Sequence, residues 1–358
     1  MKSGYVGIGI LVFTIIEIVF ISGCVQQSGQ GTQNLTQKEL SSSFVCNLID
    51  QRARDVGISG TDLGIGFERN NSIWILFGDV VGTELHKGGA SAVLLIPKRL
   101  TLDCSKMKWK TENNSFYKPL HSRRQYGDAS TVPAGAVEIS NKAYIFAMRV
   151  IKWEKFPKQT HARGVLFKEN ESGEFEEVYE WEIDDIHVNT APVKVGNKIY
   201  MIATSLYRKS PLYLAYVNLE DIDKPSKYMY FAGRDSDKII WSSNPADAKP
   251  LEGTENLKIG EVSFVYNPIL KKYFILFKSY SIKNNGFWLM YSDKPTGPFE
   301  KIKLNVCKDA DWMKLGWSGC YGGYIVPYYF GENGRDLYFT VSVWVPYTTV
   351  LLKTEFND

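Results

Sequence analysis

The sequence of 358 residues contains few cysteines and histidines, five and four respectively. It contains no Cys-x-x-Cys pair, which argues against a zinc site built on cysteines. The nucleophile-elbow motif Gly-x-Ser-x-Gly, the phosphate-binding loop and the dinucleotide fingerprint are also missing. The usual signatures of serine hydrolases and of nucleotide-dependent enzymes are therefore lacking.

Neither positive nor negative charge dominates, because 42 Lys and Arg are balanced by 39 Asp and Glu, and the net charge is only +3. Without a basic block or an RNA-type aromatic motif, we expect no nucleic-acid partner. Convincing amphipathic helices of more than two turns are lacking too. Aromatic residues make up 14% of the chain, and they favour strands, where they pack well on a pleated surface.

The one long apolar run, Val6 to Ile21, contains a single charge and is followed by Ser22-Gly23-Cys24. With Lys2 ahead of it, this pattern predicts a signal peptide over residues 1–23. A cysteine directly after Ser-Gly is typical of a lipoprotein, in which Cys24 is the lipidated first residue. The alternative is an uncleaved membrane anchor, although the run is short for a span of ~20 residues. Both readings predict an extracytoplasmic, membrane-anchored protein at the cell surface.

Residues 24–42 are polar and nearly uncharged, which predicts a flexible tether ahead of a folded part, residues 43–358. Four cysteines remain after Cys24, an even number that permits two disulfides in an exported protein. Among the three connectivities we favour Cys46–Cys104 and Cys307–Cys320. Free buried thiols are the alternative.

From Asp62 onward the pattern is that of strands, which fall into five similar groups. Each group contains a turn followed by an aromatic strand: NNSIWILFGD, SNKAYIFAMR, GNKIYMIATS, LKKYFILFKS and GRDLYFTVSV. Such units, recurring here every ~60 to ~75 residues, are typical of a propeller. We predict an all-β fold, a five-bladed β-propeller with about four antiparallel strands per blade around a central channel. A large β-sandwich is the alternative.

The segment Thr61–Asp79 predicts a β-hairpin with a central Asn-Asn turn. Pairing of its two strands would place Asp62 and Asp79 at the same end of the sheet. Glycoside hydrolysis needs one protonated carboxyl group and one ionised carboxylate. We therefore expect Asp62 and Asp79, with Glu261 from another blade, to be catalytic residues in the funnel of the propeller. Each of the three acids has a structural alternative, such as bonding backbone amides, closing a turn or pairing with an arginine.

Other residues at the ends of the innermost strands are expected to bind substrate, the aromatic ones by stacking on sugar faces. We expect no cofactor and no metal site, and leave open a channel cation such as calcium. The expected substrate-binding residues are Asn189, Arg208, Tyr266, Asn267, Tyr321, Ser342 and Trp344.

Six motifs, in order along the chain, resemble those of a propeller domain family long catalogued as of unknown function and found in exported bacterial, archaeal and phage proteins. The resemblance covers about Ser59 to Phe356. The motifs are Thr61-Asp62-Leu63-Gly64, Phe77-Gly78-Asp79, Gly260-Glu261-Val262-Ser263 with Tyr266-Asn267, Gly297-Pro298-Phe299, Tyr321-Gly322-Gly323-Tyr324, and Ser342-Val343-Trp344 with Pro346-Tyr347.

Some members of that family are endo-acting glycoside hydrolases that cut D-arabinan, and they resemble the furanosidase propellers. The resemblance implies an active site in the funnel, with Asp62 and Asp79 as the carboxylate pair and Glu261 as a further acid. The strand around Arg208 and the loop Lys152–Ala162 depart from the family's pattern.

Three functions are consistent with these observations. The first is a surface-anchored glycoside hydrolase that cleaves a furanose-containing glycan of the D-arabinan type. The second is a lipoprotein that binds a glycan without cutting it, and the third is an envelope propeller that docks protein partners. We favour the first and expect a monomer that meets a polysaccharide or glycan and is held at the membrane by its lipid.

Overall fold

The structure is a computed structural model that describes residues 39–82, 90–99, 101–120, 128–155, 158–307 and 318–357. The chain separates into two units, Met1–Thr36 and Gln37–Asp358, and all described residues belong to the second. The predicted signal peptide and Cys24 therefore lie outside the described residues. Within the described ranges, no helix has both the length and the apolar character that a membrane span requires.

The second unit consists almost entirely of β-strands. Its α-helix α1 (Gln51–Asp55) begins after Asp50, whose side chain accepts a hydrogen bond from the Arg52 N–H. Short 3-10 helices occupy connections: η1 (Cys104–Lys106), η3 (Leu219–Asp221), η4 (Pro225–Lys227), η5 (Pro245–Asp247) and η6 (Ile282–Asn284).

Three sheets are antiparallel meanders of consecutive strands. The first contains β2 (Ile58–Arg69), β3 (Ser72–Gly82), β4 (Ala92–Pro97) and β5 (Lys108–Trp109). The second contains β8 (Ser130–Ile139), β9 (Lys142–Lys152), β10 (His161–Glu169) and β11 (Phe175–Glu180). The third contains β12 (Asn189–Val195), β13 (Lys198–Thr204), β14 (Tyr213–Asn218), β15 (Met229–Asp235) and β16 (Lys238–Ser242). A short ribbon pairs β6 (Thr111–Glu112) with β7 (Ser115–Phe116).

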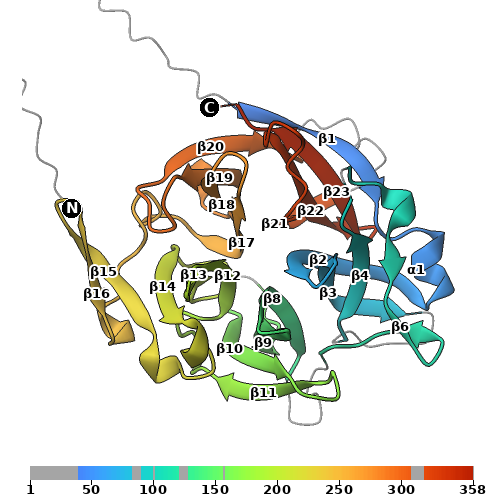
Figure 1. Cartoon of the computed structure of the whole chain (residues 1–358), viewed down its shortest axis with the longest axis horizontal. Helices are drawn as coiled ribbons and strands as arrows, with labels where there is room; N and C mark the ends of the chain where they lie inside the picture. The colour runs from blue at the N-terminus through green and yellow to red at the C-terminus, as the bar shows by residue number, and fades with distance from the viewer. Residues whose placement is uncertain are drawn as a thin grey trace, which may run out of the picture. The chain divides into compact units, whose positions relative to one another are not determined.

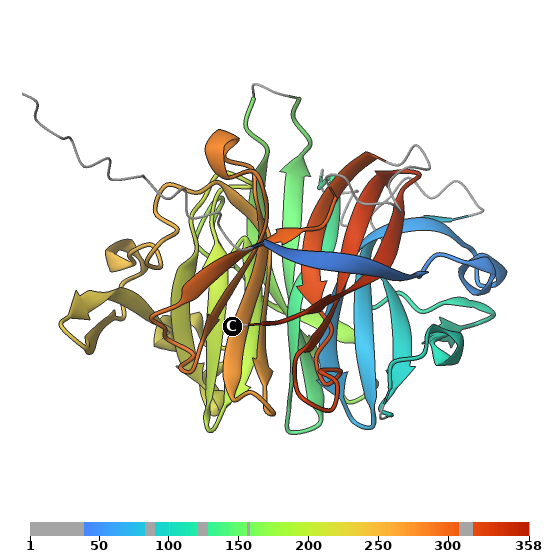
Figure 2. The ribbon, with the colours of Figure 1, turned by 90° about the horizontal axis from the view of Figure 1, so that it is seen from above.

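The fourth sheet has eight strands because β1 joins two further meanders. One meander contains β17 (Ile259–Asn267), β18 (Lys272–Ser279), β19 (Gly286–Ser292) and β20 (Glu300–Asn305). The other contains β21 (Ser318–Ile325), β22 (Asp336–Val345) and β23 (Thr348–Glu355). Strand β1 (Glu39–Asn47) pairs parallel with β20 and antiparallel with β23. Figures 1 and 2 show β1 running along the outside of the sheets, which lie around a common centre.

Strand β1 also corrects the predicted end of the tether. The folded part already includes Glu39, ahead of residue 43, because Glu39 and Leu40 pair with Lys303 and Leu304 of β20. Leu40 is buried in the core, and the Glu39 carboxylate forms an ion pair with Lys303 at 2.6 Å. Polar composition alone did not reveal this strand, since Leu40 is its only fully buried residue.

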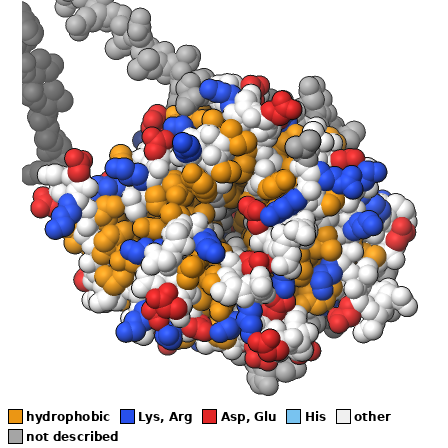
Figure 3. Space-filling model, viewed as in Figure 1, with side chains coloured by type: hydrophobic (Ala, Val, Ile, Leu, Met, Phe, Trp, Pro, Cys, Tyr) orange, Lys and Arg blue, Asp and Glu red, His pale blue; other side chains and the backbone are white. Residues whose placement is uncertain are grey.

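The core lies between neighbouring sheets, because successive side chains of a strand point to opposite faces. On β3, Ile75 belongs to the same hydrophobic cluster as Leu351 of β23, whereas Leu76 belongs to a cluster with Ile145 of β9. Further clusters join β9 to β13, β13 to β18, and β18 to β22. The five meanders are therefore linked in a closed cycle, and strands with two buried faces are apolar almost throughout. Hydrophobic side chains gather around the centre of the face seen in Figure 3.

Two sequence-based expectations are confirmed at this level. The Thr61–Asp79 segment is a hairpin in which Asp62 lies opposite Gly78, so both acids are at one end of β2 and β3. The disulfides Cys46–Cys104 and Cys307–Cys320 are both formed. They join cysteines that are 58 and 13 positions apart, and the second ends on β21.

Candidate functional site

The hairpin of β2 and β3 is irregular where it carries the two acids. Its register shifts on both sides of Asp62, and the backbones of Leu63 and Asp79 adopt positive φ angles of 65° and 42°. Neighbouring strands hold this unusual backbone in place: the Leu63 N–H donates to Ser342 Oγ at 2.7 Å, and the Tyr347 hydroxyl donates to the Asp79 main-chain carbonyl at 3.1 Å. Such bulges re-aim side chains, here toward one pocket.

Asp62 is 9% exposed and lies at the inner wall of that pocket. Its Oδ2 accepts a hydrogen bond from the Tyr321 hydroxyl at 2.9 Å, while its Oδ1 is buried without a hydrogen-bond partner among the described residues. Burial raises the pKa of Asp62 well above its ordinary value, and the neighbouring charge of Asp79 raises it further. This carboxyl group is therefore suited to carry a proton.

Asp79 is half-buried and lines the same pocket. Its Oδ1 accepts a hydrogen bond from Ser130 Oγ, on the first residue of β8, at 2.7 Å. Because the two acids are electrostatically coupled, a negative charge on Asp79 disfavours one on Asp62. The arrangement thus distinguishes the two carboxyl groups by burial and by hydrogen bonding.

Glu261 reaches the site through Arg208. Nε and Nη2 of Arg208 donate to Glu261 Oε1 at 3.1 and 2.6 Å, and the Tyr280 hydroxyl donates to Oε2 at 3.1 Å. Burial alone would raise the pKa of Glu261, but the charge and hydrogen bonds of Arg208 outweigh it and lower that pKa. Glu261 is fully buried and does not line the pocket, so it acts on the site as the partner of Arg208.

Arg208 lies between aromatic rings. Its guanidinium carbon is 4.8 Å from the ring centres of both Tyr207 and Tyr280, and 5.3 Å from that of Tyr321. Its backbone has a φ of 54°, the left-handed conformation that glycine commonly supplies. Gly260 is required beside it, because a Cβ there would lie 2.8 Å from Arg208 Cγ and 2.9 Å from Tyr280 Cε2.

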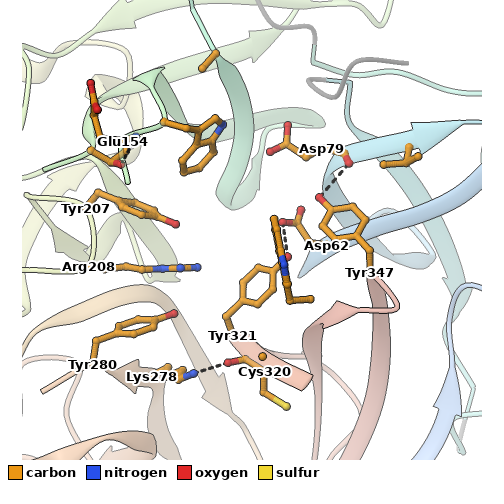
Figure 4. A pocket seen from close by; sticks show the side chains of 16 residues that line it. Asp62, Asp79, Glu154, Tyr207, Arg208, Lys278, Tyr280, Cys320, Tyr321 and Tyr347 are labelled. Carbon is orange, nitrogen blue, oxygen red and sulfur yellow. Dashed lines mark hydrogen bonds between the residues drawn. The ribbon is translucent and has the colours of Figure 1, made fainter. Parts of the chain in front are cut away.

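The pocket has a volume of about 1000 Å³. Figure 4 shows Tyr207, Arg208 and Tyr280 in a row on one side, pointing toward Asp62 and Asp79 on the other. The side chain of Trp344 at the pocket is 63% exposed. The lining residues are Asp62, Asp79, Val81, Ala129, Trp153, Glu154, Thr160, Tyr207, Arg208, Lys278, Tyr280, Gly319, Cys320, Tyr321, Trp344 and Tyr347.

The structure thus brings Asp62, Asp79, Arg208, Tyr321 and Trp344 to one pocket, and it places the other expected binding residues elsewhere. Tyr266 and Asn267 lie at the far end of β17, and at about 3.3 Å per residue Asn267 is roughly 20 Å along the strand from Glu261. Their assignment to the funnel was wrong because a strand has only one end there.

Two further residues near the pocket have structural contacts instead of lining it. The side chain of Asn189 is buried, and its Nδ2 faces Met148 Sδ at 3.7 Å. Ser342 is buried, and its hydroxyl oxygen accepts the hydrogen bond from the Leu63 N–H. Both therefore support neighbouring strands rather than contacting the open pocket.

The sequence-based expectations also missed residues of the pocket wall. Tyr207 and Tyr280 flank Arg208, and Tyr347 stands beside Asp79. Trp153 follows β9 in the loop that departs from the family's pattern. Its ring packs edge-on against that of Tyr207, with the two ring centres 5.6 Å apart. The unusual loop and the Pro346-Tyr347 motif were the available signals, but neither indicates by itself which way a ring points.

The described residues contain no group of three or more His, Cys, Asp or Glu side chains that could hold a metal ion. The pocket itself offers a buried acid, a second carboxyl group, and a cation held between aromatic rings.

Comparison with solved structures identifies proteins of similar fold at low identity. A presumed hydrolase from Bacteroides ovatus is 13% identical with a TM-score of 0.57, over 86% of this chain and 87% of that one. The GH32 β-fructofuranosidase BmSUC1 of Bombyx mori is 10% identical with a TM-score of 0.50, over 86% of this chain and 64% of that one. At these identities the likeness concerns the fold alone.

A search of curated proteins finds no significant match to the sequence. A family model described as "Domain of unknown function (DUF4185)" matches residues 49–353, which include every residue of the pocket. The chain therefore belongs to the DUF4185 family.

Proposed function

We propose that the protein is a glycoside hydrolase that cleaves a furanose-containing glycan of the D-arabinan type. The observation that carries this proposal is the pairing of Asp62 and Asp79 in one open pocket, with burial favouring the protonated form of Asp62. Two carboxyl groups in different environments meet the basic requirement of glycoside hydrolysis.

In this mechanism Asp62 is the general acid. Its proton passes to the glycosidic oxygen as the bond between that oxygen and the anomeric carbon breaks. Asp79 acts on the other side of that carbon, either by taking a proton from the attacking water or by attacking directly. Arg208, held by Glu261, supplies a fixed positive charge beside the sugar, and the aromatic rings offer flat faces for stacking.

The fold supports the same proposal. We infer that the five meanders are the blades of a five-bladed propeller, since five hydrophobic clusters link them in a closed cycle. One protein of similar fold is a β-fructofuranosidase, an enzyme that acts on a furanoside. Similar folds host different activities, so the residues of the pocket carry the argument.

We further propose that the protein is a monomeric lipoprotein anchored at the cell surface through Cys24, which would place the pocket where glycans are met. Growth with a labelled fatty acid would test the anchor. Label is expected in the wild type and should be lost in Cys24→Ser; label that persists in the variant would contradict lipidation at this residue.

The catalytic proposal is tested by incubating the protein with D-arabinan and, separately, with L-arabinan, and measuring the released reducing ends. Replacement of either acid, Asp62→Asn or Asp79→Asn, is expected to lower the rate by roughly 100-fold or more. Asp237→Asn, in the exposed turn between β15 and β16, is the matched control and should retain the wild-type rate. Equal rates in all three variants would refute the site.

A glycan-binding protein without hydrolytic activity is the second candidate. The exposed rings of Trp153 and Trp344 at the pocket favour glycan binding whether or not a bond is broken. Binding of arabinan by the wild type without any product would support this second function over the first.

A further inference from the structure

The pocket has a cationic side opposite its two acids. Lys278, near the end of β18, and Arg208 both line it, and Figure 4 places Lys278 beside Tyr280 on the side away from Asp79. Glu261 neutralises one of these two cations through its contacts with Arg208. The group Arg208, Lys278 and Glu261 therefore has a net charge of one positive unit.

Lys278 makes no ion pair with a described acidic residue. Its ammonium group donates to the main-chain carbonyl of Cys320 and lies 5.0 Å from the ring centre of Tyr280 and 5.7 Å from that of Phe287. Burial lowers the pKa of Lys278, which means that its charge is poorly compensated by water. An ammonium group so placed has donors left for a ligand, since Lys carries three.

We propose that Lys278 forms a subsite for a singly charged anionic group on the glycan, such as the carboxylate of a uronic acid. This rests on the proposed function in assuming that a glycan occupies the pocket. A single negative charge matches the single net positive charge of the group. The ring centres of Tyr280 and Tyr321 lie 4.8 and 5.3 Å from the guanidinium carbon of Arg208, so that these aromatic rings would contact the sugar ring that carries the anion.

The opposite side of the pocket sets the direction in which the glycan lies. The negative charge of Asp79 would repel an anion there, and Glu154 is paired with Lys152 at 2.8 Å. A sugar acid is thus directed to the Lys278 side, and the bond to be cleaved lies toward the two aspartates. The proposed substrate is then a furanose-containing glycan that also carries an acidic sugar.

Calorimetric titration tests this directly, with D-glucuronate, D-glucose and D-glucose 6-phosphate as probes. The wild type is expected to bind glucuronate roughly tenfold or more tightly than glucose. Lys278→Met should remove that preference and Lys278→Arg should retain it. Lys301→Met is the matched control, because Lys301 also donates to a main-chain carbonyl, that of Gly253, and lies 5.1 Å from a Trp288 ring, outside the pocket.

Three results would overturn the proposal: equal affinities of the wild type for glucuronate and glucose, no detectable binding of either, or an equal loss of preference in Lys278→Met and Lys301→Met. Tighter binding of the phosphate than of glucuronate would overturn the singly charged assignment. Binding needs no hydrolysis, so failure to cleave arabinan leaves this test standing. Arabinan cleavage combined with no anion preference would remove the subsite alone.

Discussion

The hydroxyl of Tyr321, on β21, donates a hydrogen bond to Asp62 Oδ2, on β2, at 2.9 Å across a sequence separation of 259 residues. The environment of the proposed acid is therefore set by a strand from the other end of the folded chain. The bond favours the ionised form of Asp62 and partly opposes the effect of burial on its pKa.

Replacing Tyr321 by Phe should raise the pKa of Asp62 further, because the hydrogen bond to its ionised form is lost. The activity limited by protonated Asp62 is then expected to persist to higher pH than in the wild type, as measured in a pH–rate profile. Tyr291→Phe removes a comparable bond to Glu300, 2.8 Å and solvent-exposed, and should leave the profile unchanged. If the fall of the rate at high pH moved to lower pH in Tyr321→Phe, the assignment of Asp62 as the acid would be contradicted.

Asp62→Asn should stabilise the protein at neutral pH. The pKa of Asp62 is raised in the folded state, so its contribution to stability is complete below the ordinary Asp pKa of about 3.9 and is lost as pH rises through the raised value. Urea unfolding at pH 4 and pH 7 would measure a gain in the free energy of unfolding for the variant that grows with pH. A gain that is the same at both pH values would exclude this explanation.

Glu261→Gln should destabilise the fold by about 3 kcal/mol, because Arg208 would keep a largely buried charge without its partner. The matched variant Glu39→Gln breaks an exposed pair with Lys303 and is expected to cost less than about 1 kcal/mol. Because the pKa of Glu261 is lowered in the folded state, the contribution of this pair is present above its unfolded pKa and is lost as pH falls. Equal free energies of unfolding for the two variants would show that the pair is not buried in solution.

Ser342→Ala should remove the side-chain oxygen that accepts the Leu63 N–H and leave that donor buried. We expect a loss of about 1 to 3 kcal/mol in the free energy of unfolding. Activity should also fall, because Leu63 holds the bulge next to Asp62. Ser43→Ala, which removes an exposed bond to the Lys353 carbonyl, should change neither quantity. Unfolding data together with arabinan cleavage measured at a temperature where both variants are folded would separate the two effects.

Local sequence patterns determined much of this protein. Alternating and continuous apolar runs predicted the strands, the Asn-Asn turn predicted the hairpin, and the hairpin placed Asp62 and Asp79 at one end, because antiparallel pairing needs only local information. The repeated aromatic strands indicated units that must stack on one another, and the cysteine count permitted the two disulfides that the structure contains.

Only the tertiary structure decided which strand ends share the pocket. Tyr266 and Asn267 lie at the opposite end of β17 from the pocket, and Glu261 contacts Arg208 without lining the pocket. Lys278 and Tyr280, at the end of β18, line it instead. The tertiary structure also decided the protonation of Asp62, since that depends on burial by residues hundreds of positions away. Contacts between sheets and the desolvation that they cause are not encoded in any single stretch of the chain. The sequence therefore predicts the two aspartates as a pair, and the packing of the sheets gives them different chemistry.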